Sequence, residues 1–265
     1  MKEMIEERAI MEDVKGPEEK GEEIDFKITD KVANLMMRIA ENNYGSRDEI
    51  GVLFTSYGYR FRLIKGLKLL GMISELKTHV IPSKVYFLTP LGYDYLESRG
   101  LLRVPDHFNQ SNFRIATCFH TLAGLEVRLI FEKHKLVSDW NPERVLNYAI
   151  RKDSRMVDAE FNFCGIHCGL EVELTLKAPR VIEENLKKLK GRNELKNIFW
   201  IIRNRNVFDS IRNVYGFSPN QTAILNDDQE HHLFIMLDDL QKNRLDSNVF
   251  NLNEKKIKFG ELEFK

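Results

Sequence analysis

The fold of the second half of this chain is decided by Met156-Val157-Asp158-Ala159-Glu160-Phe161 and by Glu171-Val172-Glu173-Leu174-Thr175-Leu176-Lys177. Alternating apolar and polar residues in these stretches predict β-strands over residues 155–163 and 168–176. The Gly-containing stretch 164–169 between them suits a short turn. The sequence therefore predicts a β-hairpin.

The acidic side chains of this hairpin are the first candidate functional residues. Successive side chains of a strand point to opposite faces, so Glu171, Glu173, Thr175 and Lys177 are expected on one side. Asp158, near the open end of the hairpin, is expected beside that row. Three carboxylates that converge on a sheet edge suit a hard cation of the kind that assists phosphodiester cleavage. The alternative is an ordinary solvent-facing strand edge.

Helices and strands alternate around this hairpin, which predicts an α/β (α+β) arrangement with a mixed sheet flanked by helices. Strand 197–203 is apolar throughout and is expected to be buried on both faces. Residues 255–259 add an edge strand or stay mobile. The other expected elements are helices over 113–135, 140–146, 179–190 and 206–215, and a strand over 233–237.

Composition allows one large domain or two ordinary ones. The chain has 265 residues, of which 43% are hydrophobic and 30% charged, and a formal net charge of +0. Three cysteines argue against a disulfide framework and for a reducing compartment. No stretch is apolar for the length of a membrane span, and the early glutamates do not suit a secretory signal. We expect a cytoplasmic protein with no membrane partner.

Charge is unevenly distributed along this neutral chain. Residues 1–24 are acidic, contain Gly16-Pro17 and are expected to form a mobile tail. No acidic residue lies between Glu49 and Glu75, whereas several basic residues do. A basic face hidden in a neutral total suits contact with DNA.

Residues 25–100 carry a recognisable order of elements. Ser46 and Glu49 form a capping box, and Gly71 suits a helix end. The expected elements are a helix from Thr29 or Asp30, a helix from Ser46, a helix over 57–70, strands over 72–76 and 84–89, and a helix from Pro90. This is the winged helix-turn-helix order, and RLIKGLKLLGMI…VYFLTPLGYDYL resembles that family's recognition helix, wing and trailing helix. The resemblance implies a DNA-binding domain, followed by a linker over 101–112.

The third helix carries the candidate DNA contacts. Its buried side is expected to consist of Phe61, Ile64, Leu67 and Leu70. A basic and aromatic side is left for a major groove. The residues expected to contact DNA are Tyr57, Tyr59, Arg60, Arg62, Lys65 and Lys68. The alternative is a protein-binding winged helix whose basic residues are merely solvated.

Residues 113–265 resemble the PD-(D/E)xK nuclease-like fold of restriction endonucleases. That family places an Asp at the start of one strand and Glu-x-Lys on its partner; here these are Asp158 and Glu171-x-Glu173, with Glu173 at the lysine position. The resemblance implies that Asp158, Glu171 and Glu173 bind Mg²⁺ or Mn²⁺. Lys177 is a candidate catalytic residue, although it lies about 13 Å along an extended strand and reaches a phosphate only if the strand bends. Glu143 is a candidate fourth carboxylate.

The two halves together resemble the replication-relaxation proteins, and most of all the MobC-type relaxases of mobilisable plasmids and integrative elements. The stretches that carry this resemblance are FHTLAGLEVRLIFEKH, DW-NPERVL, RKDSRMVDAEFNF, LEVELTLK and LKKLK…IFWIIRN. It implies nicking of one strand at a transfer origin, and relaxosome accessory or coupling proteins as partners. His120 and Arg128 either contact DNA or pack a helix. A Tyr nucleophile, Tyr148 or Tyr215, competes with a metal-activated water.

Several alternative interpretations of the sequence remain open. The main rival is a non-catalytic winged-helix regulator of replication or transcription, with the nuclease-like domain as an inactive scaffold or as the platform of a homodimer. A third is a defence-type restriction endonuclease. Lys187, Lys188 and Lys190 either track DNA phosphates or are solvated. The remaining minor candidates are a zinc site at Cys164, His167 and Cys168, which lacks a clear fourth ligand, and a solvated strand entrance at His231-His232.

Overall fold

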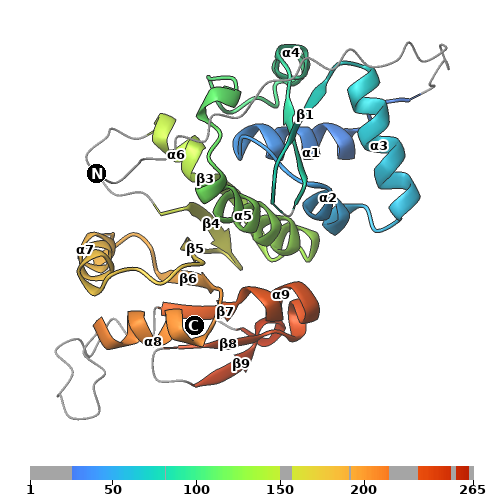
Figure 1. Cartoon of the computed structure of the whole chain (residues 1–265). Coiled ribbons are helices and arrows are strands. Elements are labelled where there is room, and N and C mark those ends of the chain that lie inside the picture. The colour runs from blue at the N-terminus through green and yellow to red at the C-terminus, as the bar shows by residue number, and fades with distance from the viewer. Residues whose placement is uncertain are drawn as a thin grey trace, which may run out of the picture.

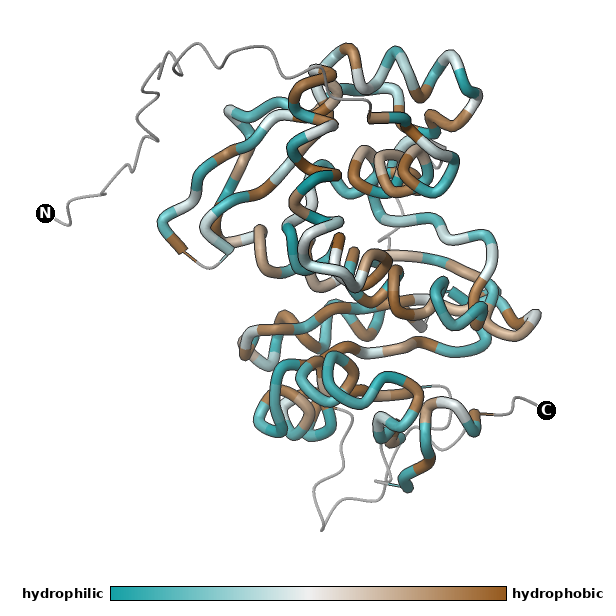
Figure 2. Tube along the Cα trace, turned by 90° about the vertical axis from the view of Figure 1, so that its right-hand side faces the viewer, coloured by the Kyte–Doolittle hydropathy of each residue, from teal (hydrophilic) through white to brown (hydrophobic). Residues whose placement is uncertain are grey.

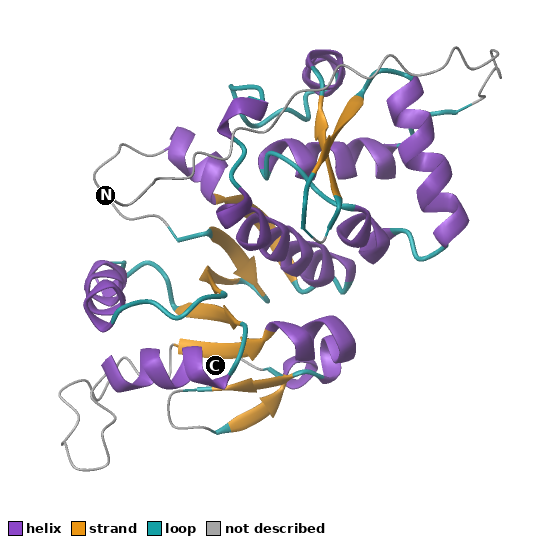
Figure 3. Cartoon of the chain, in the orientation of Figure 1, coloured by secondary structure: helices purple, strands orange, loops and turns teal. Residues whose placement is uncertain are grey.

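The computed structural model describes residues 26–80, 82–149, 157–190, 192–214, 232–251 and 255–262. Within these ranges the chain has mixed α and β structure, with a two-stranded sheet near the N-terminus and a seven-stranded mixed sheet in the second half. The two sheets lie on opposite sides of one long helix, α5 (Ile115–Lys133) (Figure 1, Figure 3). We call the part before this helix the N-terminal unit and the part after it the sheet unit.

The N-terminal unit has the element order that the sequence predicts. Its elements are α1 (Asp30–Glu41), α2 (Arg47–Leu53), α3 (Tyr57–Leu69), β1 (Ile73–Lys77), β2 (Lys84–Leu88) and α4 (Pro90–Ser98). Local side-chain caps define the helix starts: Thr29 accepts a hydrogen bond from the Val32 backbone, and Ser46 and Glu49 form the expected capping box. Gly71, with φ of 68°, follows α3 where a left-handed residue is needed.

The orientation of α3 differs from the expectation. Leu63, Ile64 and Leu67 are buried, whereas Phe61 is 59% exposed and Leu70 is also exposed. Apolar residues occur all round this helix, so one apolar set had to stay outside once Leu63 entered the core beside α1. The prediction that Phe61 and Leu70 are buried was wrong.

The segment expected as a linker packs against the units on both sides of it. Val104 is buried in the core of the N-terminal unit, and His107 stacks on Tyr93. A short 3₁₀ helix, Gln110–Asn112, leads into α5. Arg103 donates to the backbone oxygen of Trp140 in the sheet unit, at 2.9 Å.

The seven strands of the sheet unit follow one another in space in chain order, from β3 to β9. Strands β5, β6 and β7 run parallel, and the other neighbours pair antiparallel. The strands are β3 (Val137–Pro142), β4 (Ala159–Phe163), β5 (Ile166–Glu173), β6 (Asn197–Ile202), β7 (His232–Met236), β8 (Asn248–Phe250) and β9 (Lys256–Lys258). The helices are α6 (Glu143–Ala149), α7 (Pro179–Lys190), α8 (Arg205–Val214) and α9 (Leu237–Asn243), with 3₁₀ turns at Arg244–Asp246 and Phe259–Glu261.

Helices cover both faces of the large sheet. Phe199 and Ile201 of β6 pack in a core with α5, whereas Trp200 and Ile202 pack in a second core with α7 and α8. The prediction that this strand is buried on both faces is confirmed. Apolar residues accordingly recur along the strands in the interior of the sheet unit (Figure 2).

Three local predictions in α5 and the sheet unit were wrong. The residues Trp140 to Pro142 end strand β3 instead of starting a helix, and α6 begins at Glu143. The hairpin turn is only Cys164-Gly165, both with positive φ, so Ile166 already belongs to β5. The spacing of apolar residues along the predicted helix 113–135 also places Phe119 toward the core, whereas Phe119 is exposed on α5.

A largely buried ionic network ties helix α5 to the N-terminal unit. Arg128 is 2% exposed and its guanidinium contacts Glu41 of α1 at 2.5 Å and Glu132 at 2.8 Å. Arg103 pairs with the other oxygen of Glu41 at 3.0 Å, and Arg38 pairs with the other oxygen of Glu132. Of the two roles considered for Arg128, the structure therefore favours helix packing over a DNA contact.

Candidate functional site

The β4–β5 ladder positions Asp158. Ala159 pairs with Leu170, so Asp158 lies one step further along, beside Glu171. The Asp158 backbone N–H donates to the Leu170 oxygen at 2.9 Å, and Oδ2 of Asp158 accepts from the Val172 N–H at 2.7 Å. The structure thus brings the Asp and the Glu-x-Glu of the sequence to neighbouring places at the ends of two strands.

Glu171 and Glu173 lie on one face of β5, as strand alternation predicts, but not at a sheet edge. Strand β5 is paired on both sides, and Glu171 and Glu173 are only 4% and 6% exposed. The register sets them beside Trp200 and Ile202 of β6, on the face covered by α7 and α8. The expected sheet-edge position was wrong because the following parallel strand covers β5. Burying two carboxylates is costly unless partners compensate for the loss of water.

Lys177 returns to the carboxylates because the strand ends early. β5 stops at Glu173 instead of continuing to residue 176, so Thr175 and Lys177 lie beyond it. The Lys177 Nζ lies 2.5 Å from Oε2 of Glu173. Lys177 was expected to reach a phosphate only if the strand bends. The chain does turn before Lys177, so this condition is met.

His120 of α5 is the neighbour that sequence reasoning did not connect to this cluster. Its Nε2 lies 3.1 Å from Oδ2 of Asp158, although the residues are far apart in the sequence. Burial opposes the charged imidazolium, but the hydrogen bond and charge of Asp158 outweigh it and raise the pKa of His120. Glu143, the candidate fourth carboxylate, is held nearby because its N–H donates to the Asp158 backbone oxygen at 2.8 Å. We call Asp158, Glu171, Glu173, Lys177 and His120 the acidic cluster.

The acidic cluster does not form a complete metal shell in the described part of the chain. Among those residues, no three His, Cys, Asp or Glu side chains are grouped so as to hold a metal ion. Its carboxylate oxygens nevertheless have the donor chemistry that Mg²⁺ or Mn²⁺ prefers, and Mg²⁺ commonly uses only one or two protein carboxylates, together with water and substrate phosphate.

The Cys164–Cys168 region has other roles. His167 pairs with Glu160 at 3.3 Å, and burial raises the pKa of the Cys168 thiol to about 12. Zinc binds the thiolate form, so this environment disfavours Cys168 as a ligand. His232 is buried and accepts a hydrogen bond from the Trp200 indole at 2.8 Å, so the expected solvated position was wrong for it. Its neighbour His231 lies outside the described residues.

The second candidate site is the exposed side of α3. Tyr57, 62% exposed, is flanked by the guanidinium groups of Arg47 and Arg60 at 5.4 and 5.6 Å from its ring centre. The Arg47 Nη1 also donates to the Tyr57 hydroxyl at 3.3 Å. Arg62 is exposed, whereas Tyr59 stacks on Phe54 and is partly buried. The arrangement presents two guanidinium groups and a phenol at the N-terminus of α3.

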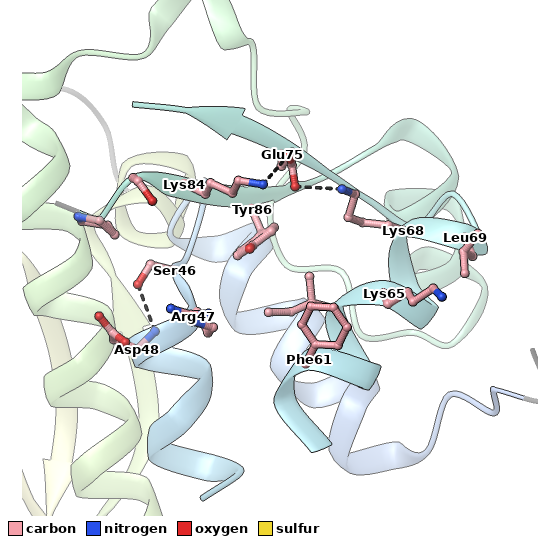
Figure 4. Close-up of a pocket in the computed structure, with 13 residues that line it drawn as sticks. Ser46, Arg47, Asp48, Phe61, Lys65, Lys68, Leu69, Glu75, Lys84 and Tyr86 are labelled. Atoms are coloured by element: carbon pink, nitrogen blue, oxygen red, sulfur yellow. Dashed lines mark hydrogen bonds and ion pairs between the residues drawn. The ribbon is translucent and has the colours of Figure 1, made fainter. Parts of the chain in front are cut away.

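A groove of about 790 Å³ separates α3 from the β1–β2 hairpin (Figure 4). Lys68 and Lys84 approach from its two walls and both donate to Glu75, at 2.8 and 3.0 Å. Burial opposes ionisation of Glu75, but the two ammonium groups outweigh it and lower its pKa. Phe61 also lines the groove. We call this surface the α3 groove.

Comparison with known proteins identifies no relative of this chain. No protein-family model, no curated protein and no solved structure matches the chain. In the described ranges, no helix combines the length and the apolar character needed to cross a membrane. The acidic cluster and the exposed side of α3 are therefore the two features of the structure that indicate a function.

Proposed function

We propose that the N-terminal unit is a winged helix that binds double-stranded DNA, with α3 in the major groove and the β1–β2 hairpin as the wing. The supporting observation is the outward row of aromatic and basic residues on α3, opposite the face that closes the core. Tyr57 and Arg62 are exposed, and Arg47 and Arg60 flank the Tyr57 ring. A helix of this kind offers side chains to base edges at its start and cations to phosphates along its length.

Selection from a random pool of DNA duplexes, followed by fluorescence anisotropy on the enriched site, tests this function. Arg62→Gln and Tyr57→Ala should each weaken binding about 5- to 100-fold, the range of one lost base or phosphate contact in a specific complex. The matched control is Arg180→Gln, which removes one exposed charge from α7. Absence of salt-sensitive duplex binding, or equal affinities for the control and the α3 variants, would reject the proposal.

We further propose that the acidic cluster cleaves one strand of the bound DNA with Mg²⁺ or Mn²⁺. The protein would then act as a nicking enzyme or relaxase at an origin-type site. The observations that favour this activity are the strand register, which sets Asp158 opposite Glu171, and the return of Lys177 to Glu173. The finer assignment, a MobC-type relaxase acting with accessory or coupling proteins, rests on the sequence resemblance.

The chain's own residues have distinct roles in this proposal. Asp158 and Glu171 would hold the cation, with Glu173 completing the shell as Lys177 leaves it for the substrate phosphate. When bound, the cation would lower the pKa of a water molecule and stabilise negative charge on the phosphate. His120 holds the Asp158 carboxylate in place through its 3.1 Å contact. Tyr148, exposed on α6, remains the alternative nucleophile, and Tyr215 lies outside the described residues.

Supercoiled plasmid carrying the selected site provides the test, in Mg²⁺ and in Mn²⁺. Wild-type protein should convert it to the open-circular form, and Asp158→Asn or Glu171→Gln should slow nicking at least 100-fold without changing DNA affinity. Loss of a covalent protein–DNA adduct in Tyr148→Phe would identify that residue as the nucleophile.

Two outcomes support rival functions. Site-specific binding with no cleavage in either metal would support a non-catalytic regulator of replication or transcription. Double-strand cutting that needs no origin would support a restriction-type endonuclease.

A further inference from the structure

We propose that the acidic N-terminal segment, residues 1–24, docks in the α3 groove of its own chain and competes with DNA there. Docking itself rests on the groove and on the segment; only the competition rests on the proposed DNA-binding function.

The groove has an apolar floor that the fold leaves uncovered. Phe61 and Leu69, 59% and 56% exposed, lie along the same side of α3, two turns apart. Large apolar side chains that stand together on a surface mark a binding site more often than single ones do. The occupant should therefore offer apolar side chains to this part of α3.

The rim of the groove is basic. Its lining includes four cations, Arg47, Lys65, Lys68 and Lys84, against only two acidic residues, Asp48 and Glu75. Figure 4 shows these side chains arranged around Phe61, from α2, α3 and the hairpin. An occupant with an excess of carboxylates matches this rim.

Residues 1–24 combine the two required properties. They contain nine acidic and four basic residues. Met1, Met4, Ile5 and Met11 recur at the spacing of one helix face, with Glu3, Glu6 and Asp13 on the opposite face. Unbranched methionine side chains adapt to irregular apolar surfaces such as the one between Phe61 and Leu69.

The described chain begins against α3 itself. The Phe26 ring covers Gly66, where even a Cβ atom would lie 2.5 Å from the ring. The preceding segment therefore starts beside the helix that carries Lys65 and Leu69. The 13 residues of α3 span about 20 Å, whereas 24 extended residues reach about 80 Å, so the segment can cover the whole groove at a high effective concentration.

A fluorescein-labelled peptide of residues 1–24 tests docking without DNA. It should bind a protein that starts at Asp25, which keeps every described contact, and bind the full-length chain at least 10-fold more weakly because the groove is already occupied. Phe61→Ser and Leu69→Ser should each weaken peptide binding at least 5-fold, and Val181→Ser, at an exposed apolar residue on α7, should not. Peptide binding that is absent, equal for both chain lengths, or insensitive to Phe61 and Leu69 would overturn the proposal.

A second set of measurements distinguishes docking of a defined sequence from nonspecific charge attraction, and tests docking separately from DNA binding. A scrambled peptide of the same composition should bind at least 5-fold more weakly; equal binding would reject a defined dock. Full-length protein with Glu18, Glu19, Glu22 and Glu23 changed to Gln should bind labelled peptide more tightly than wild type, and no change would count against the proposal.

Competition with DNA is tested by removal of residues 1–24, which should raise duplex affinity about 10-fold. If the peptide docks but neither the full-length nor the truncated protein binds DNA, the DNA-binding function is rejected and docking is still supported. Equal duplex affinities of the two proteins would reject the competition.

Discussion

The ionic network of Arg128, Glu41, Glu132, Arg103 and Arg38, which we call the Arg128 network, and the acidic cluster both pair carboxylates with cationic side chains, but the kind of cation differs. In the Arg128 network, arginines meet all four carboxylate oxygens of Glu41 and Glu132. In the acidic cluster, a histidine contacts Asp158 and a lysine contacts Glu173. Arginine stays charged and binds carboxylates with fixed geometry, whereas lysine is a flexible point charge and histidine titrates near neutral pH. We infer that the first network holds α5 against the N-terminal unit and that the second can exchange its partners for a cation or a phosphate.

The largest expected effect is on the Arg128 network. Arg128→Met should lower the free energy of unfolding by about 3–5 kcal/mol, because Glu41 loses its closest cation inside the protein. Arg180→Met on α7, which breaks an exposed i,i+4 pair with Glu184, should cost less than about 0.5 kcal/mol. Urea unfolding measures both values. Similar losses for the two variants would contradict a structural role for Arg128.

A second prediction concerns Glu49, a buried carboxylate on α2. Burial raises its pKa to about 7, although hydrogen bonds with Ser46 oppose the shift. The folded state therefore keeps a proton that the unfolded chain releases near pH 4.5, so wild-type stability falls as pH rises through this interval. Glu49→Gln keeps an acceptor for the Ser46 N–H and has no charge to bury. Its advantage should grow from near zero at pH 4 to about 3 kcal/mol at pH 8 in urea unfolding. An advantage that does not change with pH would contradict this assignment.

The third prediction contrasts the acidic cluster with the Arg128 network directly. Asp158→Asn retains an acceptor for the Val172 N–H and loses only a partly exposed pair with His120, so it should cost less than about 1 kcal/mol. Mg²⁺ at millimolar concentration should raise the Tm of the wild type and leave that of Asp158→Asn unchanged. A loss as large as that of Arg128→Met, with no effect of Mg²⁺ on either protein, would show that the cluster is structural.

The smallest expected effect lies in the α3 groove. Glu75→Gln releases Lys68 and Lys84 from their shared carboxylate, so duplex affinity should rise about 2- to 5-fold at low salt. Glu184→Gln, an exposed acid paired with Arg180, is the control and should leave affinity unchanged. Weaker binding by Glu75→Gln would indicate that Glu75 positions the lysines for DNA.

Local signals made the N-terminal unit predictable. The Ser46–Glu49 capping box, the Thr89-Pro90 helix start and the glycine after α3 act over three or four residues, and each appears where the sequence predicts it. The rotation of α3 was not predictable because Phe61 and Leu63 are both apolar and lie on different sides of the helix. Only packing against α1 decides which of them is buried.

The candidate site was predictable in composition but not in its surroundings. Strand alternation places Glu171 and Glu173 on one face, yet their burial depends on β6 pairing from a distant part of the chain. The Asp158–His120 and Arg128–Glu41 contacts join residues 38 and 87 positions apart. Strand β3 escaped prediction because it is largely polar and ends in Pro142, and its pairing with β4 is irregular.

The number of phosphate contacts made by α3 can be measured from the salt dependence of duplex binding. The logarithm of the binding constant should fall linearly with the logarithm of salt concentration, with a slope that reports the number of phosphate contacts. Changing Arg62 and Lys65 on α3 to Gln should make the slope shallower by about 2, whereas changing the exposed Lys255 and Lys256 at the start of β9 to Gln should leave it unchanged. An unchanged slope for the α3 variant, or an equal change for the β9 variant, would reject binding of DNA by α3.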